Sequence, residues 1–183
     1  MKERKYKEDW VNETRFDEKT GREKRVPVYR GDWYHLSGDR TKRKLLLEAL
    51  LPWIGFVALI LAYYKLNFPG ATVLYVFLPA GLSLFPALYW ILGVAGLFRT
   101  EEKMTRLRKE NGIGRILRSA AGCTVCAFAA ILGDIVFLLA GSQAGKEWPG
   151  TLMLALASVL ACGTVNCFRG VNRTLISGKG NVR

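Results

Sequence analysis

Long apolar runs alternate with short polar segments along most of this chain. Four of the runs are long enough to cross a lipid bilayer, because a hydrocarbon core about 30 Å thick needs roughly 20 apolar residues in a helix. They cover residues 45–64, 71–98, 119–140 and 148–168. Each run is too long for a buried strand, and membrane helices tolerate the Gly and Pro residues inside them. The pattern predicts an all-α integral membrane protein built as a four-helix bundle over residues 45–168.

Three polar segments flank or interrupt the predicted bundle: an N-terminal segment at residues 1–44, a connector at 99–118 and a tail at 169–183. In the N-terminal segment Trp10, Thr14 and Phe16 fall at even spacing, and Val26 and Val28 repeat that period. Residues 18–21 between them have the composition of a turn. This spacing predicts a short β-hairpin.

The connector at residues 99–118 has the pattern of a short helix. Thr100 is a suitable N-cap, and Asn111 followed by Gly112 is a common helix stop. We therefore expect a helix that ends at this pair and lies on the membrane surface.

The positive charges are concentrated in the three polar segments. The N-terminal segment holds fourteen of the 27 Lys and Arg residues, the connector holds seven and the tail holds four. The short loops at 65–70 and 141–147 hold only Lys65 and Lys146. Because Lys and Arg accumulate in cytoplasmic loops, this distribution predicts a multi-pass protein of the cell membrane with both termini in the cytoplasm.

The basic segments also indicate which partners to expect. Lys and Arg residues next to a first membrane helix contact anionic lipid headgroups, so the bilayer itself is the expected partner. The N-terminal segment contains nine acidic residues as well, which weakens any field for phosphate backbones. No nucleic acid is expected.

Asp134 is the one ionisable side chain placed well inside a predicted span. A charged group in a membrane interior is costly, so such a residue is by default a functional hypothesis. Asp134 is either a titrating site for proton- or cation-coupled transport or a polar contact that holds the bundle together. The expected partners from the same half of the membrane are Tyr63, Tyr64, Tyr75, Lys65 and Lys146.

The second run contains Pro79 and Pro86 near its middle, together with Gly81 and Ser83. A kink is therefore expected there. Discontinuous helices of this kind line substrate or ion paths in transporters, which makes Pro79 and Pro86 candidates for a gate. The alternative is an ordinary kinked or tilted membrane helix.

Cys123 and Cys126 form a Cys-x-x-Cys motif, and Cys162 and Cys167 fall at a similar depth on the fourth run. The motif suits thiol exchange or metal binding. However, residues five apart lie about 140° apart around a helix, so Cys162 and Cys167 cannot both face one closed site. Small residues surround all four cysteines, and this favours close helix packing without any metal or cofactor.

The motifs of common catalytic sites are missing from the sequence, including the Walker loop, His-Glu-x-x-His and Gly-x-Ser-x-Gly. The sequence therefore favours a non-catalytic membrane component that binds a protein partner or assembles with itself. The alternative is a small oligomeric transporter or channel that uses Asp134. A third hypothesis is a membrane thiol or metal protein.

Overall fold

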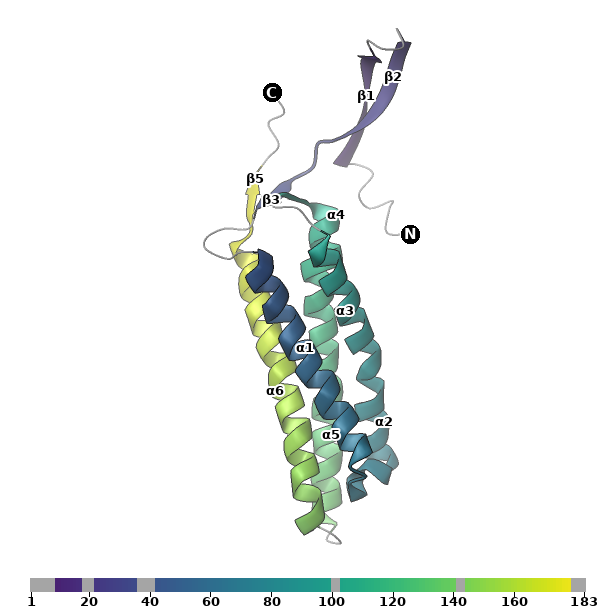
Figure 1. Ribbon diagram of the computed structural model, residues 1–183, viewed down its shortest axis with the longest axis vertical. Coiled ribbons are helices and arrows are strands. Elements are labelled where there is room, and N and C mark those ends of the chain that lie inside the picture. Colours follow the sequence, from purple (N-terminus) through teal and green to yellow (C-terminus); the bar gives the residue numbers. More distant parts are fainter. Residues whose placement is uncertain (1–8, 18–21, 36–41, 100–102, 141–143, 179–183) are drawn as a thin grey trace.

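The computed structural model describes residues 9–17, 22–35, 42–99, 103–140 and 144–178. It is mostly helical, and the long helices run side by side along the length of the molecule (Figure 1). Four helical stretches are long and apolar enough to span a membrane, as the sequence predicted: Lys42–Lys65, Leu74–Phe98, Arg106–Leu139 and Lys146–Thr174.

The bundle is organised around two antiparallel helices, α5 (Arg115–Leu139) and α6 (Ala144–Thr174), which share the most extensive contact. Small side chains such as Ala127 and Ala161 are buried between the helices and allow this close approach. Helix α1 (Lys42–Lys65) packs on α6, whereas α2 (Leu74–Leu82) and α3 (Leu84–Phe98) pack on α5. The close packing that the small residues on the third and fourth runs favoured is confirmed.

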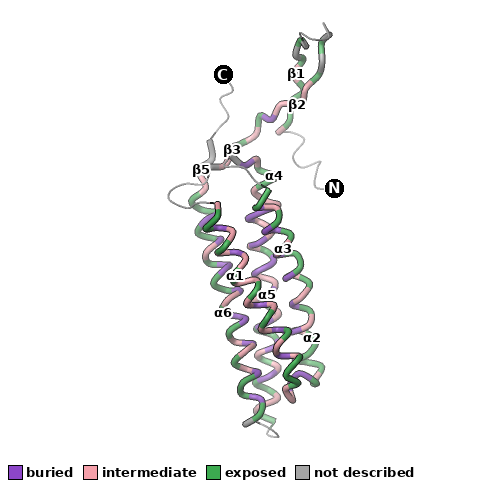
Figure 2. The backbone as a smooth tube through the Cα atoms, in the orientation of Figure 1, coloured by how far each residue is buried: buried purple, intermediate pink, exposed green. Residues whose placement is uncertain are grey.

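The outer faces of the helices are strongly apolar. Figure 2 shows buried positions along the inner face of each helix and exposed positions along the outer face. Large side chains such as Leu51, Phe85 and Leu132 are more than 60% exposed. Soluble monomers seldom expose apolar surface of this extent, so the bundle needs lipid or protein around it.

The second long span is divided into α2 and α3 by a turn at Ser83. The N–H of Ser83 donates to the carbonyl of Pro79 (3.1 Å), and its hydroxyl donates to the carbonyl of Ala80 (2.6 Å). Pro86 has no N–H with which to continue the helical pattern in the next turn. The interruption thus falls between Pro79 and Pro86, where a kink was expected.

The strands formed by the described residues lie at one end of the bundle (Figure 1). We call it the strand end, and we call the opposite end, which contains the 3₁₀ turn η2 (Pro69–Thr72) and the start of α6, the loop end. Strands β1 (Trp10–Asp17) and β2 (Arg22–Tyr29) form the predicted antiparallel hairpin, although residues 18–21 lie outside the described residues. Strand β3 (Trp33–His35) pairs with both β4 (Lys103–Thr105) and β5 (Ile176–Gly178), which the sequence analysis did not predict.

The prediction for the connector is wrong. After β4 the chain forms α4 (Arg106–Lys109) and a π-helical turn, η3 (Glu110–Gly114), which continues directly into α5. Gly112 does not stop the helix, because it is buried against α3. The two backbones approach closely here: a Cβ on Gly96 of α3 would lie 3.0 Å from the carbonyl of Asn111, the residue before Gly112. The small residues serve close helix packing here. Thr105 caps α4, while Thr100 lies outside the described residues.

Tyr29 connects the β1–β2 hairpin to the bundle. Its hydroxyl donates to the carbonyl of Asp32 (3.1 Å) and accepts from the N–H of Arg106 (3.2 Å). Its ring lies edge-on to Trp10 and Trp33, with ring centroids 5.3 and 5.2 Å away. Burial raises the pKa of Tyr29, so the hydroxyl remains a donor above the usual titration range of tyrosine.

Candidate functional site

Two carboxyl groups meet inside the bundle at the loop end. Asp134 lies near the end of α5 and Glu147 lies in the first turn of α6, and both side chains have no exposed surface. A Cβ placed on Gly70 of η2 would lie 2.5 Å from Oδ1 of Asp134 and 2.6 Å from Oε1 of Glu147. The two carboxyls therefore converge on one point of the loop, and we call them the carboxyl pair.

The donors around the carboxyl pair come from three different elements. The N–H of Gly70 donates to Oε2 of Glu147 (2.7 Å), and the Tyr63 hydroxyl of α1 lies 3.5 Å from Oε1. The Thr151 hydroxyl of α6 donates to Oδ2 of Asp134. Oδ1 of Asp134, although fully buried, receives no hydrogen bond within the described part of the chain.

The loop between α1 and α2 has the shape that this site requires. Asn67 adopts a positive φ of 57°, and Pro69 starts the η2 turn in which the N–H of Gly70 points toward α6. Because the carboxyl oxygens occupy the space of a side chain at residue 70, only glycine fits there. Next to Asp134 on α5, a Cβ on Gly133 would lie 2.8 Å from the carbonyl of Tyr75, so α2 also packs directly on α5.

The expected partners of Asp134 are only partly correct. Tyr63 is fully buried beside the carboxyl pair, but it hydrogen-bonds Glu147. Tyr64 instead donates to the carbonyl of Phe77 (2.8 Å), whereas Tyr75 is 47% exposed. The side chains of Lys65 and Lys146 are likewise exposed. The principal partner, Glu147, was assigned to an external loop by the sequence analysis, which is corrected here because α6 begins at Ala144.

The four cysteines do not form a cluster. Cys123 is buried and its thiol lies 3.6 Å from the carbonyl of Ser83, while Cys126 is only partly buried. Cys162 is exposed, and the thiol of Cys167 contacts Glu48 at 3.2 Å. Within the described residues, no three His, Cys, Asp or Glu side chains are arranged to hold a metal ion.

Pro79 and Pro86 lie away from the carboxyl pair, on the two sides of the break at Ser83. Pro86 packs against α5, where a Cβ on Gly122 would lie 3.1 Å from its ring. The break is linked to the carboxyl pair along the chain, because η2 is followed almost immediately by α2.

Comparison of the chain with protein-family models, curated proteins and solved structures finds no match. The class that the fold defines is a helical bundle with four helices that are long and apolar enough to cross a membrane. Within this fold, the carboxyl pair is a site at which two facing acids can share a proton.

Proposed function

We propose that the four long helices cross the cell membrane and that both termini lie in the cytoplasm. The lengths and composition of the helices and their exposed apolar faces support the crossing. The excess of Lys and Arg in the segments at the strand end supports the orientation. In this orientation the loop end, with the carboxyl pair, faces the outside of the cell.

Within that frame, we propose that the protein is a small proton-linked transporter that uses Asp134 together with Glu147. A lone buried aspartate would be explained equally well by a structural contact. The observation that supports transport is the second buried carboxyl, since two facing acids form a site whose charge can change by one proton.

The proposed chemistry follows from the surroundings of the carboxyl pair. With both groups ionised, two negative charges would face each other where water is excluded and screening is weak. Once a proton is bound, one carboxyl donates to the other, and Oδ1 of Asp134 is an acceptor without a donor of its own. The N–H of Gly70 then stabilises the remaining charge on Glu147.

The same contacts couple the proton to the backbone. Gly70 holds η2 against Glu147 on α6, and η2 leads into α2. A change of charge on the carboxyl pair alters this contact and with it the position of α2, which is joined to α3 only through the turn at Ser83. The segment from Pro79 to Pro86 thus serves as the gate in this proposal.

Reconstituted vesicles provide the test. The full chain is inserted into liposomes that contain a pH-sensitive dye, and Na⁺ or K⁺ is added with and without an imposed membrane potential. We expect proton movement above that of protein-free liposomes and its loss in Asp134→Asn and Glu147→Gln. Glu23→Gln on the exposed hairpin is the matched control and should keep the flux.

Two results would exclude the transporter. One is wild-type flux equal to that of empty liposomes under every gradient, and the other is undiminished flux in Asp134→Asn. Infrared spectroscopy separates lost chemistry from lost folding, because an unchanged amide I band shows intact helices, whereas a protonated carboxyl has its own C=O band. This band should appear as the pH is lowered in the wild type and change in each of the two variants.

A second candidate function, a component that assembles with a second copy of itself, is supported by one face of α6. Val159, Gly163, Asn166 and Gly170 follow helical spacing and are exposed, and no atom lies within 4 Å of a Cβ placed on either glycine. Glycines allow two backbones to approach closely, and an amide such as Asn166 gains a hydrogen-bond partner across a symmetric helix pair.

The assembly hypothesis is tested by the mass of the complex in lipid nanodiscs or detergent. We expect a dimer for the wild type and a monomer for Asn166→Leu combined with Gly163→Leu. Val125→Leu on the exposed face of α5 is the matched control. A monomeric wild type, or a dimer that survives both changes, would rule out this face as the contact.

A further inference from the structure

A second site is indicated at the strand end, on the opposite side of the molecule from the carboxyl pair. A cavity of about 460 Å³ lies between the region from α4 to the start of α5, the last turns of α6, and β3. It is lined by three basic side chains, an amide, a tyrosine and a leucine: Arg106, Lys109, Arg118, Asn172, Tyr34 and Leu117. We call it the basic pocket.

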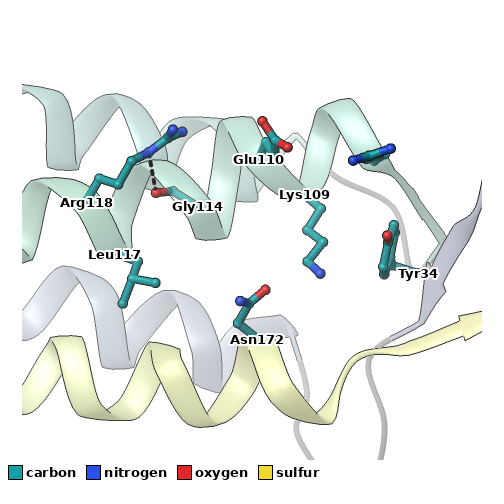
Figure 3. Close-up of a pocket in the computed structure, with 8 residues that line it drawn as sticks. Tyr34, Lys109, Glu110, Gly114, Leu117, Arg118 and Asn172 are labelled. Atoms are coloured by element: carbon teal, nitrogen blue, oxygen red, sulfur yellow. Dashed lines mark hydrogen bonds between the residues drawn. The ribbon is translucent and has the colours of Figure 1, made fainter. Parts of the chain in front are cut away.

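The basic side chains are positioned by contacts within the protein. The amine of Lys109 lies 4.1 Å from the centre of the Tyr34 ring, a cation–π contact that fixes its direction. Arg118 donates from Nε to the carbonyl of Gly114 (3.1 Å), and Figure 3 shows its guanidinium on the same side of the helix as Glu110, at the edge of the gap that Lys109 enters. Lys109 and Arg118 are therefore each held by a contact within the protein before any ligand arrives.

Figure 3 shows how the pocket is arranged between the helices. Lys109 and Asn172 reach into the gap from its two sides, and Leu117 points toward α6. The carboxylate of Glu110 also belongs to the lining, but in this view it points to the other side of its helix. The gap itself thus combines a cation and an amide with an apolar wall.

A neighbouring cavity extends the basic pocket along the outside of α5. It has a volume of about 300 Å³ and shares Arg118 with the first. Its other lining residues include Arg115, whose guanidinium lies 5.9 Å from the ring centre of Tyr89, and Pro86 of α3. Tyr89 is 60% exposed on the apolar outer face of the bundle. The two cavities together therefore join a polar, basic region to a surface that faces lipid in the proposed orientation.

We infer that the basic pocket binds a phosphate-bearing anion, and that its source is the headgroup of an anionic phospholipid. Guanidinium groups match the geometry of phosphate oxygens, and a lysine supplies a further point charge. Basic pockets between membrane helices on the cytoplasmic side suit lipid headgroups of this kind. The apolar wall at Leu117 and the exposed ring of Tyr89 favour a phospholipid over a free anion.

This inference rests on the proposed membrane orientation but does not depend on transport by the carboxyl pair. The first arm of the test measures lipid binding by native mass spectrometry of the full chain in mixed micelles of phosphatidylglycerol and phosphatidylcholine. The second arm titrates inorganic phosphate into the same protein by calorimetry. Asp134→Asn should leave both results unchanged, so a failure of the transporter and a failure of the pocket can be told apart.

We expect the wild type to retain phosphatidylglycerol in preference to phosphatidylcholine. Lys109→Gln and Arg118→Gln should each weaken binding about fivefold, equivalent to about 1 kcal/mol. Lys109→Arg keeps the charge and should keep most of the binding. Arg169→Gln removes an exposed cation from α6 that does not line the pocket and serves as the matched control.

The possible outcomes separate the sources of the phosphate. Phosphate binding that needs Lys109, without a preference for phosphatidylglycerol, would support the phosphate site and overturn the lipid as its source. Binding of neither ligand by the wild type would overturn the inference. An equal loss of lipid in Arg169→Gln and Lys109→Gln would also overturn it, because the lipid would then respond only to total charge.

Discussion

Replacement of Gly70 by alanine tests the geometry of the carboxyl pair with a single methyl group. The new Cβ would lie 2.5 Å from Oδ1 of Asp134, 2.6 Å from Oε1 of Glu147 and 3.0 Å from its carboxyl carbon. Real Cβ atoms essentially never approach other atoms closer than 3.0 Å. Because both acids are fully buried, neither can move aside without opening the contact between η2 and α6.

The expected cost can be worked out from two effects. Overpacking a well-filled site typically costs about 1–3 kcal/mol. Displacement of the loop also weakens the hydrogen bond from the N–H of Gly70 to Glu147, and hydrogen bonds to charged groups contribute about 1.5–3 kcal/mol. We therefore expect Gly70→Ala to lower the free energy of unfolding by about 2.5–6 kcal/mol.

Gly163→Ala is the matched control for the same chemical change. No atom lies within 4 Å of a Cβ at this exposed position of α6. Alanine is favoured over glycine inside a helix by up to about 1 kcal/mol, so this variant should be at least as stable as the wild type in micelles dilute enough to keep the protein monomeric.

The assay is unfolding in mixed micelles with increasing sodium dodecyl sulfate, followed by circular dichroism. Gly70→Ala should unfold at a clearly lower detergent fraction than Gly163→Ala. In an Asp134→Ala background the cost of Gly70→Ala should shrink, because half of the obstruction has been removed. Equal midpoints for the two glycine variants would refute the close approach of the loop to the carboxyl pair.

Three further substitutions test other contacts. Gly133→Ala should destabilise the bundle by about 1–3 kcal/mol in the same unfolding assay, since its Cβ would lie 2.8 Å from a backbone carbonyl of α2, and an unchanged midpoint would contradict that packing. Tyr29→Phe removes the acceptor of the Arg106 N–H. Hydrogen exchange at this amide should therefore accelerate about fivefold, which corresponds to the loss of about 1 kcal/mol of protection. An unaltered rate would show that the contact is not formed. Tyr63→Phe should lower the free energy of unfolding by less than about 1 kcal/mol, because a hydrogen bond of 3.5 Å between its hydroxyl and Glu147 is weak. A larger loss in the unfolding assay would contradict this long contact.

The long helices could be predicted because their cause is local. A run of apolar residues long enough to span a bilayer has no stable alternative to a helix there, and each predicted span overlaps one observed helical stretch except for a few residues at its ends. The break near Ser83 was predictable for the same reason, since a proline removes a hydrogen bond wherever it stands in a helix. Small residues on α5 and α6 likewise predicted the closest pair.

The three-stranded sheet could not be predicted from the same kind of pattern. Strands β3, β4 and β5 have three residues each and come from three separate parts of the chain. A three-residue strand has too few positions to display an alternating pattern, and its pairing depends on where the helices deliver its partners. The helix stop expected at Gly112 failed for a related reason, because the rule applies to solvated helix ends and this glycine is buried against α3.

Glu147 shows why half of the candidate site escaped prediction. Pro149 favours a helix start next to it, and an acidic residue at the start of a helix is ordinarily a solvated group that interacts with the helix dipole. Burial of Glu147 depends instead on the N–H of Gly70, which is 77 residues earlier in the sequence. One local pattern did point to the site, because Glu147 and Thr151 are four residues apart and so share a face of α6. That face becomes a site only when the α1–α2 loop closes over it, and loop closure is a property of the folded bundle.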